Sequence, residues 1–254
     1  MTKILVLGGI SETLQLVAGL SEKGFQVLVS QATHVPLEEP PPERVTFRHG
    51  VLDLTGLEKL AAAENISAII DCTHPYASVI SETVFKVSQK TKIPLLVYDR
   101  PGADPDIPGI VWADDHLHAA GLALSGEQRV FLSIGSSSIS VYASRAGSKV
   151  YLLHARVLPG LQFLGTCIDA GLQARQVIQA RGPFSVQENT KHFLMAQARV
   201  LVTKDSGRQG GVPAKLEAAE KLGLMVIMVR RPPRPGKLIF GSIDHLLEAL
   251  PEVL

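Results

Sequence analysis

The chain has 254 residues and a formal net charge of +1. With 46% hydrophobic and 19% charged residues, it has enough apolar material for one large folded domain or two small ones. The near-zero charge argues against a long basic face for nucleic acid, so an anionic ligand would have to meet local clusters of cations.

The hydropathy pattern predicts a cytoplasmic protein without a membrane segment. Residues 1–12 reach glycines after only a few apolar residues, which is too soon for a signal peptide. No run of about 18 apolar residues follows. Cys72 and Cys167 are far apart and lack the spacing of a zinc site. We therefore expect free thiols and no protein-bound metal.

Short apolar strands alternate with amphipathic helices along the first half. Helical periodicity is clearest at 11–24 and 79–92. The strand patterns, rich in Val, Ile and Leu, lie at 3–9, 25–31, 67–73 and 94–100. Strands that are apolar on both faces are typical of a parallel sheet.

The same alternation restarts in the second half. Further strand patterns lie at 129–135, 149–157, 174–184, 198–207 and 224–232. We predict an α/β fold with two Rossmann-like open parallel-sheet domains and the ligand cleft between them. The domains are residues 1–127 and 128–254, because the proline- and glycine-rich segment 100–109 ends the fourth strand and one more helix should follow it.

The loop after the first strand, "LGGISET", is a candidate phosphate site. Ligands of open parallel sheets bind beyond the carboxyl ends of the strands. Gly8 and Gly9 let the backbone approach a phosphate, and Ser11 and Thr13 stand near a helix N-terminus that favours anions. We predict that Gly8, Gly9, Ser11 and Glu12 contact the cofactor. The full GxGxxG pattern is missing, so a plain turn with Ser11 as helix N-cap is the alternative.

The second strand ends in "SQATHV" without the acid that an NAD site usually presents to the adenosine ribose. Ser30, Gln31, Thr33 and His34 could instead donate hydrogen bonds to a 2'-phosphate, which favours NADP over NAD. The alternative is a polar loop that contacts no ligand.

The third strand ends in "DCTHPYA", where polar side chains crowd one strand end. Histidine and tyrosine can carry protons or contact a ligand there, although a lone histidine is more often structural. We predict that Thr73 and His74 contact the cofactor. His74 and Tyr76 are candidate proton donors.

Three cations of the second half, Arg156, Arg181 and Lys204, fall at or just past strand ends. Each alone would be an ordinary surface charge, but their shared position favours a ligand with several carboxylates.

The segment "KDSGRQGG" then turns from strand to helix. Ser206 and Gly207 stand where backbone N–H groups can approach an anion, next to Asp205. We predict a ligand loop in which Ser206 and Gly207 contact the substrate.

These motifs carry a family resemblance. "LGGISET", "DCTHPYA", "ARGPF", "TKDSGRQGGVPAKLEAA" and "VIMVRRPPRP" occur in the order and approximate spacing of precorrin-6A reductase and its cobalt-precorrin-6A counterpart. The chain resembles that family over nearly its whole length. The resemblance implies an enzyme of cobalamin biosynthesis that uses NADPH to reduce one double bond of an anionic tetrapyrrole. Other enzymes of that pathway would be its partners.

Two departures from the family pattern bear on the cofactor. The family often has an arginine in the loop after the second strand and a "TGR" turn after the fifth, where this chain reads "QATHV" and "SIGSSSI". Thr33 and His34 are then left to select the 2'-phosphate, and NADH stays an alternative cofactor.

The resemblance implies hydride transfer to an electrophilic carbon of the macrocycle and protonation of its neighbour. Asp205, His74 and Tyr76 are the candidate catalytic residues. A different NADP-dependent reductase and a non-catalytic dinucleotide-sensing protein are the alternatives. "TKDSGRQGG" disfavours both, because neither needs a second polar loop. A cobalt-containing and a metal-free substrate both fit, since the macrocycle itself would hold the metal.

Overall fold

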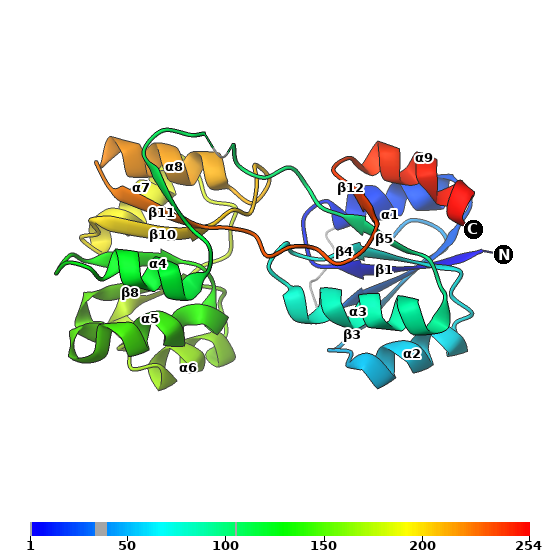
Figure 1. The fold of residues 1–254 in the computed structure, drawn as a ribbon, viewed down its shortest axis with the longest axis horizontal. Coiled ribbons are helices and arrows are strands. Elements are labelled where there is room, and N and C mark those ends of the chain that lie inside the picture. Colours follow the sequence, from blue (N-terminus) through cyan, green and yellow to red (C-terminus); the bar gives the residue numbers. More distant parts are fainter. Residues whose placement is uncertain (1, 34–39, 105) are drawn as a thin grey trace. The chain divides into compact units, whose positions relative to one another are not determined.

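The computed structural model describes residues 2–33, 40–104 and 106–254. The chain folds into two α/β units, each built on a parallel sheet of six strands (Figure 1). The first unit comprises the chain up to Pro101 together with Pro232–Leu254, and the second comprises Gly102–Arg231. The predicted pair of Rossmann-like parallel-sheet domains is thereby confirmed.

The first sheet has the strand order β3-β2-β1-β4-β5-β12. Read in chain order this is the 3-2-1-4-5-6 arrangement of dinucleotide-binding folds, and the order reverses between β1 and β4. Its strands are β1 (Lys3–Gly8), β2 (Gln26–Gln31), β3 (Val45–His49), β4 (Ala68–Cys72), β5 (Leu95–Tyr98) and β12 (Leu238–Phe240).

Two helices cover each face of this sheet (Figure 1). One face carries α1 (Thr13–Glu22) and α9 (Ile243–Val253), and the other carries α2 (Leu54–Ala63) and α3 (Ser78–Thr91). Side chains alternate between the faces, so Val6 packs with the first pair of helices and Leu7 with the second. Both faces are buried, which explains the unbroken apolar runs in the sequence.

The second sheet has the order β6-β11-β10-β7-β8-β9 and reverses between β7 and β10. Phe131, Phe193 and Leu201 form part of the core on its α7 and α8 face. Its elements are β6 (Ile110–Ala113), α4 (His116–Ala123), β7 (Val130–Ser133), α5 (Ile139–Ala146), β8 (Leu153–Val157), α6 (Leu161–Asp169), β9 (Val177–Gln179), α7 (Val186–Met195), β10 (Val200–Lys204), α8 (Val212–Lys221) and β11 (Met225–Val229), with short 3-10 turns at Ser136–Ser138, Gly147–Leu152 and Ala174–Gln176.

The unit boundaries correct the predicted division between residues 127 and 128. Residues 102–127 contribute β6 and α4 to the second unit, because β6 pairs with β11. The C-terminal residues return to the first unit, where β12 pairs with β5 and Leu246 and Leu250 of α9 are buried against the sheet. Segments distant in sequence thus complete both sheets.

Side-chain caps fix where several helices begin. Asp53 accepts a hydrogen bond from Gly56 N at 2.7 Å at the start of α2, and Ser185 and Glu188 form a reciprocal capping box at the start of α7. Within the described ranges, no helix is long and apolar enough to cross a membrane.

Candidate functional site

A cavity of about 380 Å³ opens at the carboxyl edge of the first sheet. The loops that follow β1, β2, β3 and β4 form its walls. It therefore lies where the strand order reverses, the place at which open α/β sheets bind ligands. Its lining residues are Leu7, Gly8, Gly9, Ser30, Ala32, Gly50, Val51, Leu52, Thr73, His74, Tyr76, Ala77, Ser78, Val79 and Ile80.

The glycine loop is held closely against the first residue of α1. A Cβ at Gly8 would lie 2.7 Å from Thr13 Cγ2, so this position requires glycine. Thr13 Oγ1 accepts hydrogen bonds from Gly9 N at 3.3 Å and Ile10 N at 3.4 Å. On its other side, Gly9 faces the β4 loop, with Thr73 Cα 3.7 Å from the position of an added Cβ.

Ser11 and Glu12 support this loop from outside the cavity lining. Helix α1 begins at Thr13 without a side-chain cap, so Ser11 is not its N-cap. Glu12 forms a buried ion pair with Arg100, at 3.1 Å and with side-chain exposures of 7% and 3%. It also accepts a hydrogen bond from Ser11 Oγ at 2.7 Å. Their direct contact with a cofactor stays a prediction.

A buried polar network fixes the loop after β4. Asp71 Oδ1 accepts hydrogen bonds from Thr73 N at 3.0 Å and Thr73 Oγ1 at 2.6 Å, while Oδ2 accepts one from Ser81 Oγ at 2.7 Å. Arg234 lies 3.3 Å from the same carboxylate and donates to the Thr73 carbonyl at 2.8 Å. Sequence reasoning did not connect Arg234 with this loop.

His74 and Tyr76 extend from this network into the cavity lining. Their ring centroids are 5.7 Å apart, and His74 Nδ1 accepts a hydrogen bond from Tyr76 N at 3.3 Å. In the neutral ring, an accepting Nδ1 leaves the proton on Nε2. The structure thus brings two predicted proton donors together on the β4 side of the cavity.

A cation that sequence reasoning missed is hydrogen-bonded to the β2 and β3 side of the cavity wall. Arg48 donates to Ser30 Oγ at 2.7 Å and to the Gly50 carbonyl at 3.1 Å, and both residues line the cavity. Thr33 is exposed and is not among the lining residues, and His34 lies outside the described residues.

Two exposed valines are among the residues that line the cavity. Val51 follows β3 and Val79 stands in the first turn of α3, and each is 84% exposed. Exposed apolar side chains that line a cavity indicate a place that an apolar group of a ligand can cover.

The predicted ligand loop of the second unit begins at Asp205, at the end of β10. Asp205 Oδ1 accepts hydrogen bonds from Ala103 N at 2.8 Å and Gly207 N at 3.3 Å, and Oδ2 lies 3.2 Å from Arg231 Nε. Ser206 Oγ donates to the Gly210 carbonyl at 3.2 Å. Both oxygens of Asp205 therefore act as acceptors that hold the loop and the chain segments beside it.

Lys204 is partly buried at the same strand end, and burial lowers the pKa of its ammonium group to about 8. His116, at the start of α4, hydrogen-bonds through Nδ1 with the Tyr142 hydroxyl at 2.9 Å. Burial, and then the positive charge of Lys204, lower the pKa of His116 to about 4. The imidazole is therefore neutral at neutral pH.

Arg156 is almost closed off from solvent, with 5% of its surface exposed. It donates to Asn189 Oδ1 at 2.9 Å and to Ser133 Oγ at 3.2 Å, and its guanidinium carbon lies 3.9 Å from the ring centroid of Phe184. Burial lowers the pKa of Arg156 to about 10. Arg181, in contrast, is exposed beyond β9 at the far edge of the sheet.

Like Arg156, Lys215 is a buried cation. It lies in the first turns of α8, and sequence reasoning missed it. Its Nζ donates to Thr203 Oγ1 at 3.0 Å, and Thr203 pairs in register with Ser133. Since Ser133 accepts from Arg156, the two cations occupy one face of the sheet where the strand order reverses, between β7 and β10. In the sequence, Lys215 has the pattern of an ordinary surface lysine on a helix.

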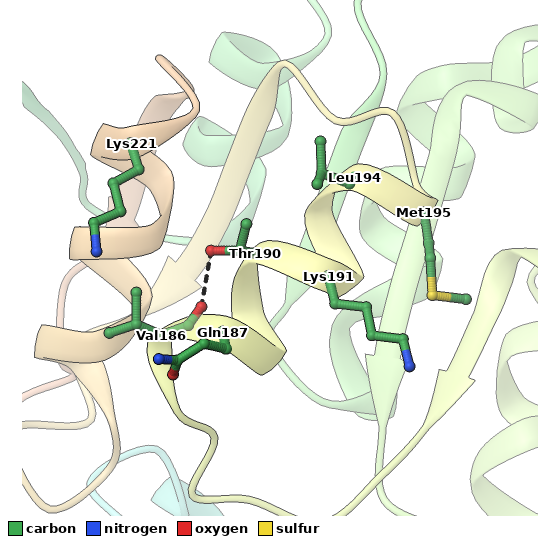
Figure 2. Close-up of a pocket in the computed structure, with 7 residues that line it drawn as sticks. All are labelled: Val186, Gln187, Thr190, Lys191, Leu194, Met195 and Lys221. Atoms are coloured by element: carbon green, nitrogen blue, oxygen red, sulfur yellow. Dashed lines mark hydrogen bonds between the residues drawn. The ribbon is translucent and has the colours of Figure 1, made fainter.

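A second hollow, on the surface of α7, contains none of the predicted site residues (Figure 2). The hydrogen bond drawn there, from Thr190 Oγ1 to the Val186 carbonyl at 2.8 Å, lies within the helix.

Across residues 2–33, 40–104 and 106–254, no group of three or more His, Cys, Asp and Glu side chains is placed to hold a metal ion. The cavity of the first unit is therefore the candidate site.

Comparison with known proteins assigns the chain to a family. The model of the family described as "Precorrin-6x reductase CbiJ/CobK" matches residues 3–251. The precorrin-6A reductase of Rhodococcus erythropolis is 36% identical over 242 residues, covering 92% of this chain and 91% of the relative. The cobalt-precorrin-6A reductase of Priestia megaterium is 27% identical over 249 residues, covering 97% of each. A solved structure of CobK precorrin-6A reductase superposes with a TM-score of 0.80 at 27% identity, over 100% of this chain and 98% of that one. The chain belongs to the precorrin-6x reductase family.

Proposed function

We propose that this protein uses NADPH to reduce one double bond of precorrin-6A or its cobalt-containing counterpart in cobalamin biosynthesis. The observation that carries the proposal is the cavity at the point where the strand order reverses, between β1 and β4, in a chain of a reductase family. The first unit binds the cofactor, and the second unit binds the tetrapyrrole. NADH is the alternative cofactor.

The cavity fits a dinucleotide in three respects. Gly8 and Gly9 let the pyrophosphate approach the backbone. The exposed side chain of Val51, which follows β3, can cover the adenine ring, because the adenosine half of a dinucleotide lies toward β2 and β3 in this fold. The nicotinamide half then lies toward β4, whose loop carries His74.

The bound nicotinamide supplies a hydride to an electrophilic carbon of the conjugated macrocycle, and the chain has to orient both ligands and supply a proton. His74 Nε2 and the Tyr76 hydroxyl can each hold that proton on the β4 side of the cavity. We rank both before Asp205. Its carboxylate already accepts hydrogen bonds and forms an ion pair within its own unit, so it is held as an acceptor.

In this proposal the second unit binds the carboxylates of the substrate. Lys204 is the cation at the end of β10, followed by the Ser206 and Gly207 backbone. Arg156 lies deeper and adds positive potential behind this edge, since buried charges are little screened. Lys215 adds only part of a charge at neutral pH, because burial lowers its pKa to about 7. Arg181 would act only as an outer, exposed contact. Cobalt, where present, belongs to the substrate.

Anaerobic incubation with NADPH and either metal-free or cobalt-bearing precorrin-6A tests the proposal. Absorbance should report the loss of NADPH, and mass spectrometry should find a product that has gained two hydrogens. If NADPH is oxidised with some other acceptor but with neither form of precorrin-6A, the protein is a different reductase. Binding of NADPH without hydride transfer to any acceptor would indicate a sensing protein.

A further inference from the structure

Arg48 is the cation that borders the adenosine side of the cavity. It pairs in register with Ser30 across β3 and β2, and its Nη1 donates both to Ser30 Oγ at 2.7 Å and to the Gly50 carbonyl at 3.1 Å. Nη2 donates to the His49 carbonyl at 3.1 Å. Because Ser30 and Gly50 line the cavity, the guanidinium is hydrogen-bonded to two residues of its wall, although Arg48 itself is not among the lining residues.

The positive charge of Arg48 is not neutralised by any carboxylate in the part of the chain that the structure describes. No Asp or Glu oxygen there lies within 4.0 Å of the guanidinium. Its hydrogen bonds within the described residues go to a hydroxyl and to backbone carbonyls, which hold the group in place without cancelling its charge. A fixed and partly buried guanidinium beside a cavity is suited to bind a phosphate group.

The location of Arg48 determines which phosphate it would meet. In this fold the end of β2 reads the 2' position of the adenosine ribose, and β2 ends here at Gln31 without an acid. A carboxylate would bind the free hydroxyl of NADH and repel a 2'-phosphate. Arg48 instead places a positive charge at this strand end from the neighbouring strand.

We propose that Arg48 binds the 2'-phosphate of NADPH and makes the site prefer it over NADH. This inference rests on the proposed function, because it presumes that the cavity holds the adenosine half of the cofactor. It assigns to Arg48 the task that the sequence alone left to Thr33 and His34.

Calorimetric titration with 2',5'-ADP and with 5'-AMP tests Arg48 without turnover, because the two fragments differ only in the 2'-phosphate. We expect the wild type to bind 2',5'-ADP about ten- to a hundredfold more tightly, the range for a charged hydrogen bond. Arg48→Gln should remove that difference and leave 5'-AMP affinity within about twofold, and Arg48→Lys should restore part of it.

Arg44→Gln is the matched control, because Arg44 is exposed and, among the described residues, its side chain donates only to the Gly24 carbonyl, at 3.3 Å. This variant should keep the full preference. If Arg48→Gln retains the preference while circular dichroism shows a native fold, the assignment of Arg48 is overturned and NADPH use stands. If the wild type itself binds both fragments equally, the NADPH part of the proposed function fails together with it.

Discussion

Lys215→Met should stabilise the protein at neutral pH. Lys215 is 7% exposed, and burial, followed by the charges of Arg156 and Lys204, lowers its pKa from 10.5 to about 7. The folded state therefore disfavours the protonated ammonium group. At about 1.4 kcal/mol per pH unit, this difference destabilises the fold at low pH by on the order of 5 kcal/mol.

Methionine has a similar length and no charge, so it should relieve most of this destabilisation. The lost hydrogen bond to Thr203 Oγ1 offsets about 1 kcal/mol of the gain. We therefore expect the free energy of unfolding to rise by roughly 2 to 4 kcal/mol at pH 7. The control is Lys221→Met on the same helix, an exposed residue paired with Glu217, which should change stability by less than about 1 kcal/mol.

The pH dependence gives the sign of the effect. Below the folded pKa of about 7, both the folded and the unfolded state carry the Lys215 charge, and the full destabilisation is present. Between pH 7 and 10.5 the folded state releases its proton first, so wild-type stability should approach that of Lys215→Met. Urea denaturation of both proteins at pH 6.5 and pH 10 measures this difference. A less stable Lys215→Met at pH 6.5 would refute the reasoning and show that the charge is compensated.

Three further predictions concern the two strand edges. Gly9→Asp should fold, because the nearest atoms to its Cβ lie 3.7 Å away, but should lose NADPH binding in a fluorescence titration through charge repulsion. Lys204→Ala should raise the KM for the tetrapyrrole with little change in kcat, and the wild-type KM should rise above pH 8 as Lys204 loses its proton. Asp205→Asn should lower the melting temperature by weakening the ion pair with Arg231, while the single-turnover rate stays within about tenfold of the wild-type rate. A fall in that rate by about 10² or more would instead support Asp205 as the proton donor.

The sequence predicts the architecture well because the central strands are apolar on both faces. Each of β1, β4 and β10 is a short run of Val, Ile and Leu followed by glycine or polar residues. The edge strands of the first sheet carry no such signal. β3 has the alternating and partly polar sequence VTFRH, and β12 has three residues and becomes a strand only by pairing with β5.

The candidate site was predictable where it follows strand ends. The loops after β1 and β4 both line the cavity, as their glycines and polar clusters suggest. Arg48 escaped prediction because its position depends on β3 pairing with β2. Arg156 reads as a free cation in the sequence, but the Phe184 ring and Asn189 enclose it. Such enclosure is a property of tertiary packing, which no local pattern encodes.

The most direct test of the central claim follows the two transferred hydrogens separately. The protein is incubated anaerobically with precorrin-6A and NADPH deuterated at the nicotinamide C4, and the experiment is repeated with unlabelled NADPH in D₂O. Hydride transfer predicts one deuterium in the product from the cofactor in the first experiment, and one carbon-bound deuterium from solvent in the second. A product that carries no deuterium from NADPH labelled on either face of C4 would contradict the account.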